Sequence, residues 1–75
     1  MNLKQLGSNK TELEIKGARV HFSYSTPVAC ESVGKLYRTS KKWSNTTTRH
    51  INSWLEGSAA EEVPQEFFNN LVKGI

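Results

Sequence analysis

The sequence predicts an α+β domain, because its hydrophobic periodicity changes near the middle of the chain. Up to Thr39 apolar and polar side chains alternate, as they do in antiparallel strands. From Ser44 onward the apolar side chains recur every three or four residues, as on helices that face a core. We therefore expect a small antiparallel sheet of about four strands in the N-terminal half, packed against two C-terminal helices.

Two strands are expected first. The run over residues 11–15 alternates and leads into a turn. The run over residues 19–25 alternates so that Val20, Phe22 and Tyr24 share one face. Polar side chains occupy its other face, which predicts an antiparallel strand with one buried and one solvated side.

Two further strands follow a break at Thr26-Pro27, because proline has no N–H to donate to a ladder. We expect the third strand over residues 28–33 and the fourth over residues 36–39. The dipeptide Gly34-Lys35 between them is typical of a tight hairpin.

Two helices are expected in the second half. Ser44 is a good N-cap for a helix over residues 45–55, and Gly57 suits the positive φ that follows a helix end. Pro64 favours the first turn of a second helix. The apolar stripe of that helix comprises Phe67, Phe68, Leu71, Val72 and Ile75. The expected core comprises Phe22, Ile51, Trp54, Phe67, Phe68 and Leu71.

The length of 75 residues, 36% of them apolar, predicts one small domain spanning residues 1–75. The single cysteine, Cys30, cannot form an internal disulfide, and the N-terminus has no secretory signal, so we expect a cytoplasmic protein. No apolar run approaches the roughly 20 residues that cross a bilayer, so no membrane contact is expected. The apolar stripe that ends at Ile75 suggests that the chain gains stability as a homodimer.

Charge is distributed unevenly along the chain. Residues 1–34 carry four cations against three glutamates, residues 35–50 carry five cations and no acid, and residues 51–75 carry four glutamates against one lysine. The net charge of +3 therefore hides a strongly basic segment, residues 35–50, followed by an acidic one.

The sequence does not favour an enzyme. Cys30 would need a base, yet only His21 and His50 are available and the chain has no aspartate to orient either ring. The same three residues lack the paired spacing of a zinc site. The five glycines are isolated, so no phosphate loop is present. We expect no catalytic residues, no metal and no cofactor.

The basic segment is the candidate site. It combines cations and hydroxyls that suit phosphates, aromatic rings that suit bases, and a helix N-terminus that favours anions. The expected nucleic-acid contacts are Lys35, Tyr37, Arg38, Lys41, Lys42, Trp43, Arg49 and His50. The alternative interpretation is structural, with Tyr37 and Trp43 as core anchors, the threonines as a capping region and the lysines as a solvated turn.

Several short stretches of the chain carry a family resemblance. They are Tyr37-Arg38-Thr39, Lys42-Trp43-Ser44, Thr46-Thr47-Thr48-Arg49-His50-Ile51-Asn52, Trp54-Leu55, and Val63-Pro64-Gln65-Glu66-Phe67-Phe68 with Leu71. These stretches resemble a small uncharacterised domain of tailed-phage and aquatic bacterial genomes. The resemblance covers nearly the whole chain from Leu6 onward. The resemblance implies a phage-type origin and a stand-alone domain, and it carries no activity or site.

We therefore expect a non-enzymatic binding module of phage type that contacts nucleic acid through its basic segment. The alternative is a protein-interaction or self-assembly module that binds a host or phage protein. Its apolar anchors would be Tyr37, Trp43, Trp54 and the stripe of the second helix.

Overall fold

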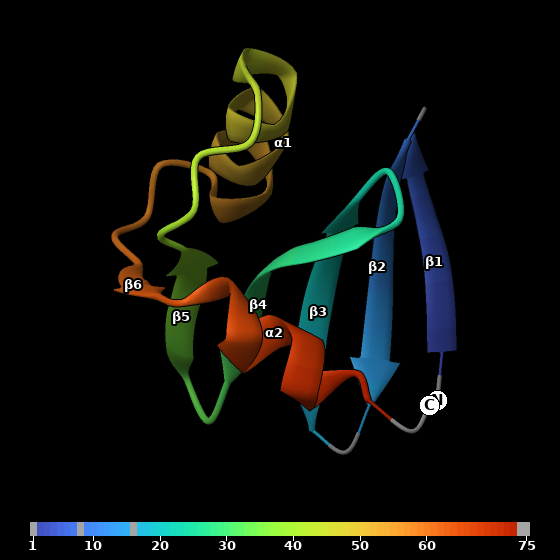
Figure 1. The fold of residues 1–75 in the computed structure, drawn as a ribbon. Helices are drawn as coiled ribbons and strands as arrows, with labels where there is room; N and C mark the ends of the chain where they lie inside the picture. The colour runs from blue at the N-terminus through green and yellow to red at the C-terminus, as the bar shows by residue number, and fades with distance from the viewer. Residues whose placement is uncertain (1, 8, 16, 74–75) are drawn as a thin grey trace.

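The computed structural model describes residues 2–7, 9–15 and 17–73. It confirms an α+β fold (Figure 1). Its elements in chain order are β1 (Asn2–Gly7), β2 (Lys10–Ile15), β3 (Ala18–Ser23), β4 (Thr26–Ser32), β5 (Lys35–Thr39), α1 (Asn45–Leu55), β6 (Glu61–Val63) and α2 (Gln65–Leu71).

All six strands form one sheet in sequential order. Strands β1 to β5 pair antiparallel, whereas β6 pairs parallel to β5 because α1 carries the chain back between them. The expectation of about four strands was too low, since β1 and β6 were not predicted. Both lie at the edges of the sheet.

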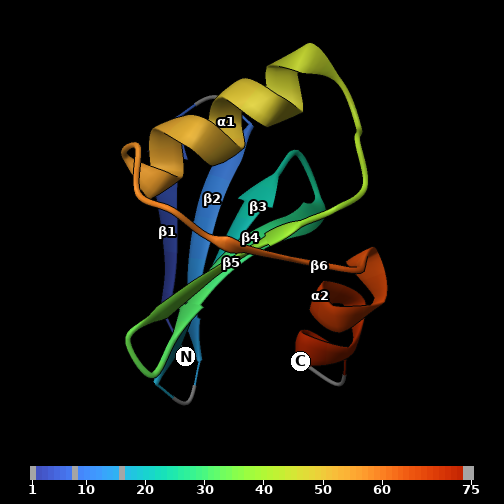
Figure 2. The same cartoon turned by 90° about the vertical axis from the view of Figure 1, so that its left-hand side faces the viewer.

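The two helices cover opposite faces of the sheet (Figures 1 and 2). Ile51 and Leu55 of α1 form a buried cluster with Val28 and Ala29 of β4. Phe68 of α2 forms the second cluster with Val20 and Cys30. The core is therefore split into two layers with the sheet between them.

Strand β3 is buried on both faces except at Arg19, which is exposed, and this corrects the prediction of one solvated side. Val20 is buried toward α2, and the alternate residues His21 and Ser23 are buried toward α1. The alternation is present, but α1 crosses over the polar side. The polar side chains His21 and Ser23, which the sequence places on a solvated face, are therefore buried under α1.

Two predicted turns are displaced. The chain reverses at Tyr24-Ser25, not at Thr26-Pro27, and Pro27 lies inside β4 opposite Phe22. The register shifts between His21 and Phe22, and such an irregularity is where an internal strand tolerates proline. The next hairpin turns at Val33 and Gly34, with φ of 52° and 76°, so Lys35 already belongs to β5.

The helix predictions are mostly confirmed. Helix α1 has the expected bounds, and the Ser44 side chain accepts a hydrogen bond from the Thr47 N–H at 3.1 Å. Gly57 has the expected positive φ. Pro64 is the N-cap residue of α2 and precedes its first helical residue.

The core prediction holds for Ile51 and Phe68, which are buried, and Phe22, Trp54 and Leu71 are partly buried against the two clusters. Phe67 was wrongly placed in the core, because it is 37% exposed. Its ring lies beside those of Tyr37 and Phe68, at the margin of the second cluster. Ile75, the end of the predicted stripe, lies outside the described residues.

Candidate functional site

Four of the predicted contact residues surround one hollow where β5 leads into α1. They are Arg38, Lys41, Lys42 and Trp43, and the hollow encloses about 240 Å³. Its remaining lining residues are Thr39, Ser40, Thr47, Thr48, Ile51 and Glu62. We call this feature the β5–α1 hollow.

The loop that carries the two lysines is fixed at both ends. The Lys41 N–H donates to Thr39 Oγ1 at 3.1 Å, and the Ser40 N–H donates to the Val63 carbonyl at 2.8 Å. At its far end Ser44 caps α1. These bonds hold Lys41 and Lys42 beside the N-terminus of an 11-residue helix, which favours negative charge.

Arg38 brings an incompletely used guanidinium to the hollow. Its Nη1 donates to Asn52 Oδ1 at 3.2 Å, which ties it to α1. Its Nε is buried and has no hydrogen-bond partner among the described residues. An unpaired buried donor is costly, and this cost is part of holding Arg38 between β5 and α1.

Trp43 is partly exposed and is held by two contacts. Its Nε1 donates to Gln65 Oε1 at 3.1 Å, and Lys41 Nζ lies 4.2 Å from the ring centroid. Gln65 also donates to the Pro27 carbonyl at 2.7 Å, so the indole is connected through α2 to β4. Trp43 is therefore not a core anchor, and a cation already contacts its ring.

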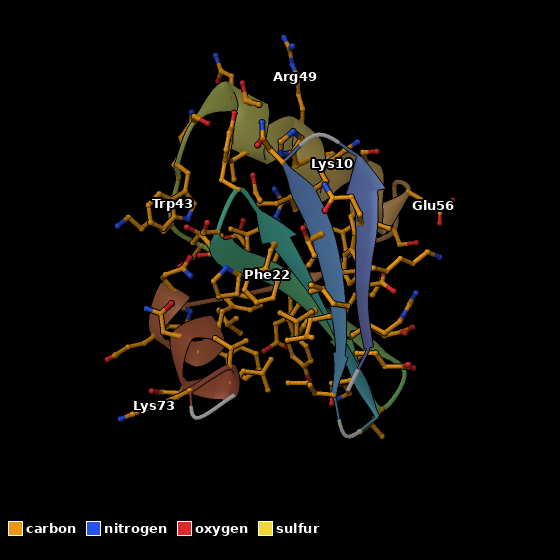
Figure 3. All side chains as sticks on the ribbon, turned by 90° about the vertical axis from the view of Figure 1, so that its right-hand side faces the viewer. Lys10, Phe22, Trp43, Arg49, Glu56 and Lys73 are labelled. Atoms are coloured by element: carbon orange, nitrogen blue, oxygen red, sulfur yellow. The ribbon has the colours of Figure 1, made fainter. Side chains whose placement is uncertain are left out.

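The other four predicted residues do not join the hollow. Lys35 begins β5, so it lies at the opposite end of the strand, and Tyr37 packs toward α2, 5.4 Å from the Phe67 ring. Arg49 projects outward from α1, away from Trp43 (Figure 3). His50 lies under α1, where its Nδ1 is 2.8 Å from Ser23 Oγ. The basic segment is thus not one continuous surface.

The acidic C-terminal segment lies beside the basic one in space. Glu62 of β6 is the ladder neighbour of Arg38 in β5, and it lines the β5–α1 hollow. The charge separation along the chain is therefore reduced in the fold. Three cations and one carboxylate border the hollow, so the net charge of its lining is positive but small.

A polar cluster lies buried between α1 and the sheet. Ser23 Oγ is 3.1 Å from Thr47 Oγ1 as well as within hydrogen-bond distance of His50. The ring of His21 stacks on Trp54, with centroids 5.4 Å apart, and Trp54 Nε1 donates to Glu12 at 2.9 Å. These contacts join α1 to the sheet.

This cluster escaped sequence reasoning, although a signal for it exists. His21 and Ser23 are alternate residues on one strand face, and Thr47, His50 and Trp54 recur at helical spacing. Ser23 is buried, so its hydroxyl beside His50 serves docking of the helix and is not exposed to a substrate.

Burial shifts the pKa values of three side chains. It lowers the pKa of His21 to about 4, and it lowers the pKa of His50, with Lys10 acting in the same direction. It raises the pKa of the fully buried Cys30 thiol to about 11. A protonated, inaccessible thiol is the opposite of what a reactive cysteine requires.

The fold and the hollow define a small six-stranded α+β domain with a cationic surface hollow. The chain belongs to a family of unknown function, DUF8033, whose model matches residues 1–70. No curated protein and no solved structure matches the chain. In the described part of the chain, no helix has the length and apolarity needed to cross a membrane. Across residues 2–7, 9–15 and 17–73, no group of three or more His, Cys, Asp or Glu could hold a metal ion.

Proposed function

We propose that this protein is a non-enzymatic binding module that contacts nucleic acid through the β5–α1 hollow. One observation carries the proposal: Arg38, Lys41, Lys42 and Trp43 converge there from a strand and the loop that follows it. Of the eight residues expected from the sequence, only these four form a common site. Lys35, Tyr37, Arg49 and His50 are not part of the proposed contact.

The chemistry of the hollow suits a phosphate with an attached base. The two lysines neutralise phosphate charge, and Arg38 adds a third positive charge to the lining of the hollow. Trp43 supplies an aromatic ring at the rim, on which a base can stack once Lys41 moves to a phosphate. Stacking needs an unpaired base, so the proposal favours single strands.

The test is a titration with single-stranded and duplex DNA and RNA over a series of salt concentrations. Three cations border the hollow, so log affinity is expected to fall against log salt with a slope of about −2.7 on duplex DNA and about −2.1 on single strands. Replacing Lys41 and Lys42 together by Ala should flatten that slope by about two phosphates. Trp43→Ala should weaken single-strand binding by about 1 to 3 kcal/mol.

The matched control replaces Lys35 and Lys73 together by Ala, which removes the same charge from exposed positions outside the hollow. It should leave the slope nearly unchanged. Equal effects of the two double variants would contradict the proposal, because they would report net charge alone. So would the absence of binding at low salt.

A protein partner is the alternative, and it loses two of its expected anchors. Tyr37 and Trp54 are partly buried against the two core clusters, which leaves Trp43 and Phe67 as exposed members of that set. A phage-type origin and a cytoplasmic location accompany the nucleic-acid proposal. The genes that flank the coding sequence test the first of these, and cell fractionation tests the second.

A further inference from the structure

We propose that two copies of this chain associate through β1, so that the sheet continues from one copy into the other across a two-fold axis. This inference does not depend on the nucleic-acid proposal, because the β5–α1 hollow lies at the other side of the sheet. It rests on the two sheet edges, the apolar face beside β1 and the local charge.

The two edges of the sheet differ in how well they are protected. At one edge β6 has three residues and is followed by Pro64, and short strands and proline discourage further pairing. At the other edge β1 has six residues, no proline and a single charged side chain, Lys4. Its outer side pairs with no strand in the described chain. The register of β1 shifts between Gln5 and Gly7, where the Gln5 side chain donates to the Gly7 carbonyl. The regular part of the edge, before this shift, exposes backbone donors and acceptors to another strand.

An apolar hollow adjoins this edge on the face that carries α2. It encloses about 310 Å³ and is lined by Leu3, Thr11, Leu13, Phe22, Tyr24 and Ser25. Leu3 is 73% exposed, and Tyr24 is also exposed. Helix α2 lies over β3 and β4 and leaves β1 and β2 open (Figure 1), and Figure 3 shows Phe22 between α2 and β2. The edge and the open apolar face together form one surface.

Charge favours a second copy of the chain as the occupant of this surface. The whole chain carries +3, so two copies repel each other wherever their cations meet. Strands β1 and β2 are balanced, since Lys4 and Lys10 accompany Glu12 and Glu14. Two copies can therefore approach here without net repulsion, which is not the case at the β5–α1 hollow.

Antiparallel pairing also satisfies the symmetry of a dimer. When an edge strand pairs with its own copy about a two-fold axis, both copies contribute the same surface and no further edge is created. Any register except one centred on Lys4 keeps the two ammonium groups from lying directly opposite. The two Leu3 side chains then add apolar contact beside the new ladder.

Sedimentation velocity over a wide range of protein concentrations tests the proposal. The wild type should shift from the 8.5 kDa monomer to twice that mass as concentration rises. Leu3→Lys should raise the dissociation constant at least about tenfold, because it places a charge in the contact. The matched control is Val33→Lys, since Val33 is 94% exposed on the β4–β5 turn and gains the same charge. It should dimerise like the wild type.

Hydrogen exchange and a second variant complete the test. The β1 amides should be protected at high concentration in the wild type and exposed in the Leu3 variant. Tyr24→Lys charges the other side of the same apolar hollow and replaces the Leu3 variant if that one does not fold. A wild type that stays monomeric, assembles beyond a dimer, or is dissociated equally by Val33→Lys would overturn the proposal.

Discussion

Acidification is expected to destabilise this fold through His21. The His21 ring is fully buried against Trp54, and neither ring nitrogen has a hydrogen-bond partner of good geometry among the described residues. Burial is the main reason that its pKa falls to about 4. Among its neighbours, His50 and Lys10 lower the pKa further, whereas Glu12 and the Thr11 backbone oppose the change.

The direction in which stability changes with pH follows from the lowered pKa of His21. In the unfolded chain His21 takes up a proton near its ordinary pKa of 6.5, whereas in the fold it does so only near 4. Stability is therefore complete above pH 6.5 and is lost as the pH falls from 6.5 toward 4. Between pH 7 and pH 5 this single group should remove about 2 kcal/mol. The lowered pKa of His50 acts in the same direction. Such a loss is large for a domain of marginal stability.

Urea unfolding at pH 7, 6 and 5 measures the effect, and His21→Phe is the matched variant. Phenylalanine keeps an aromatic ring beside Trp54 but binds no proton, so the variant should lose about 2 kcal/mol less than the wild type over this range. An equal loss of unfolding free energy in both proteins would refute the assignment to His21.

Two further substitutions test the fold. Val33 is a β-branched residue at φ 52° that is 94% exposed, so Val33→Asn should raise stability by about 1 kcal/mol and the melting temperature by about 4 to 8 °C. A lower melting temperature would contradict the turn geometry. Phe68→Ala should cost about 3 to 5 kcal/mol, because the side chain is fully buried, and the adjacent Phe67→Ala should cost clearly less. Equal losses in denaturant unfolding would show that the two rings are wrongly placed.

Local signals in the sequence were sufficient for α1. Ser44 caps the helix with its own side chain, and Glu56 and Gly57 both have positive φ after it, so neither end depends on distant residues. The apolar side chains Ile51 and Leu55 are one helical turn apart and both are buried. Where the capping residues and the apolar side chains indicate the same helix, its first and last residues can be predicted from the sequence.

The missed strands depend on distant residues. Strand β6 has three residues, two of them glutamate, and it exists because Tyr37 and Thr39 of β5 align with Glu61 and Val63. Strand β1 pairs with β2 at the edge of the sheet, and no second strand pairs with it within the described residues. Short polar segments have little intrinsic preference for the β conformation. They form strands because they pair with a neighbouring strand, and that pairing is not visible in the local sequence.

The predicted contact residues are divided between different parts of the fold for a similar reason. Neighbours on a strand point to opposite faces, so Arg38 lies toward α1 while Tyr37 lies toward α2. Within α1, His50 follows Thr47 at i+3 and shares its buried side, whereas Arg49 is turned outward. A continuous basic stretch of sequence is therefore not one continuous surface in the fold.

Thr47 connects the buried polar cluster to the β5–α1 hollow, because it lines the hollow and its hydroxyl also lies 3.1 Å from Ser23 Oγ. The shape of the hollow therefore depends on how α1 is docked, and that docking depends on neutral His21 and His50. Lysine and arginine stay charged throughout the acidic range. A loss of nucleic-acid affinity below pH 6 would accordingly report undocking of α1, whereas above pH 7 the same titration measures the cations of the hollow alone.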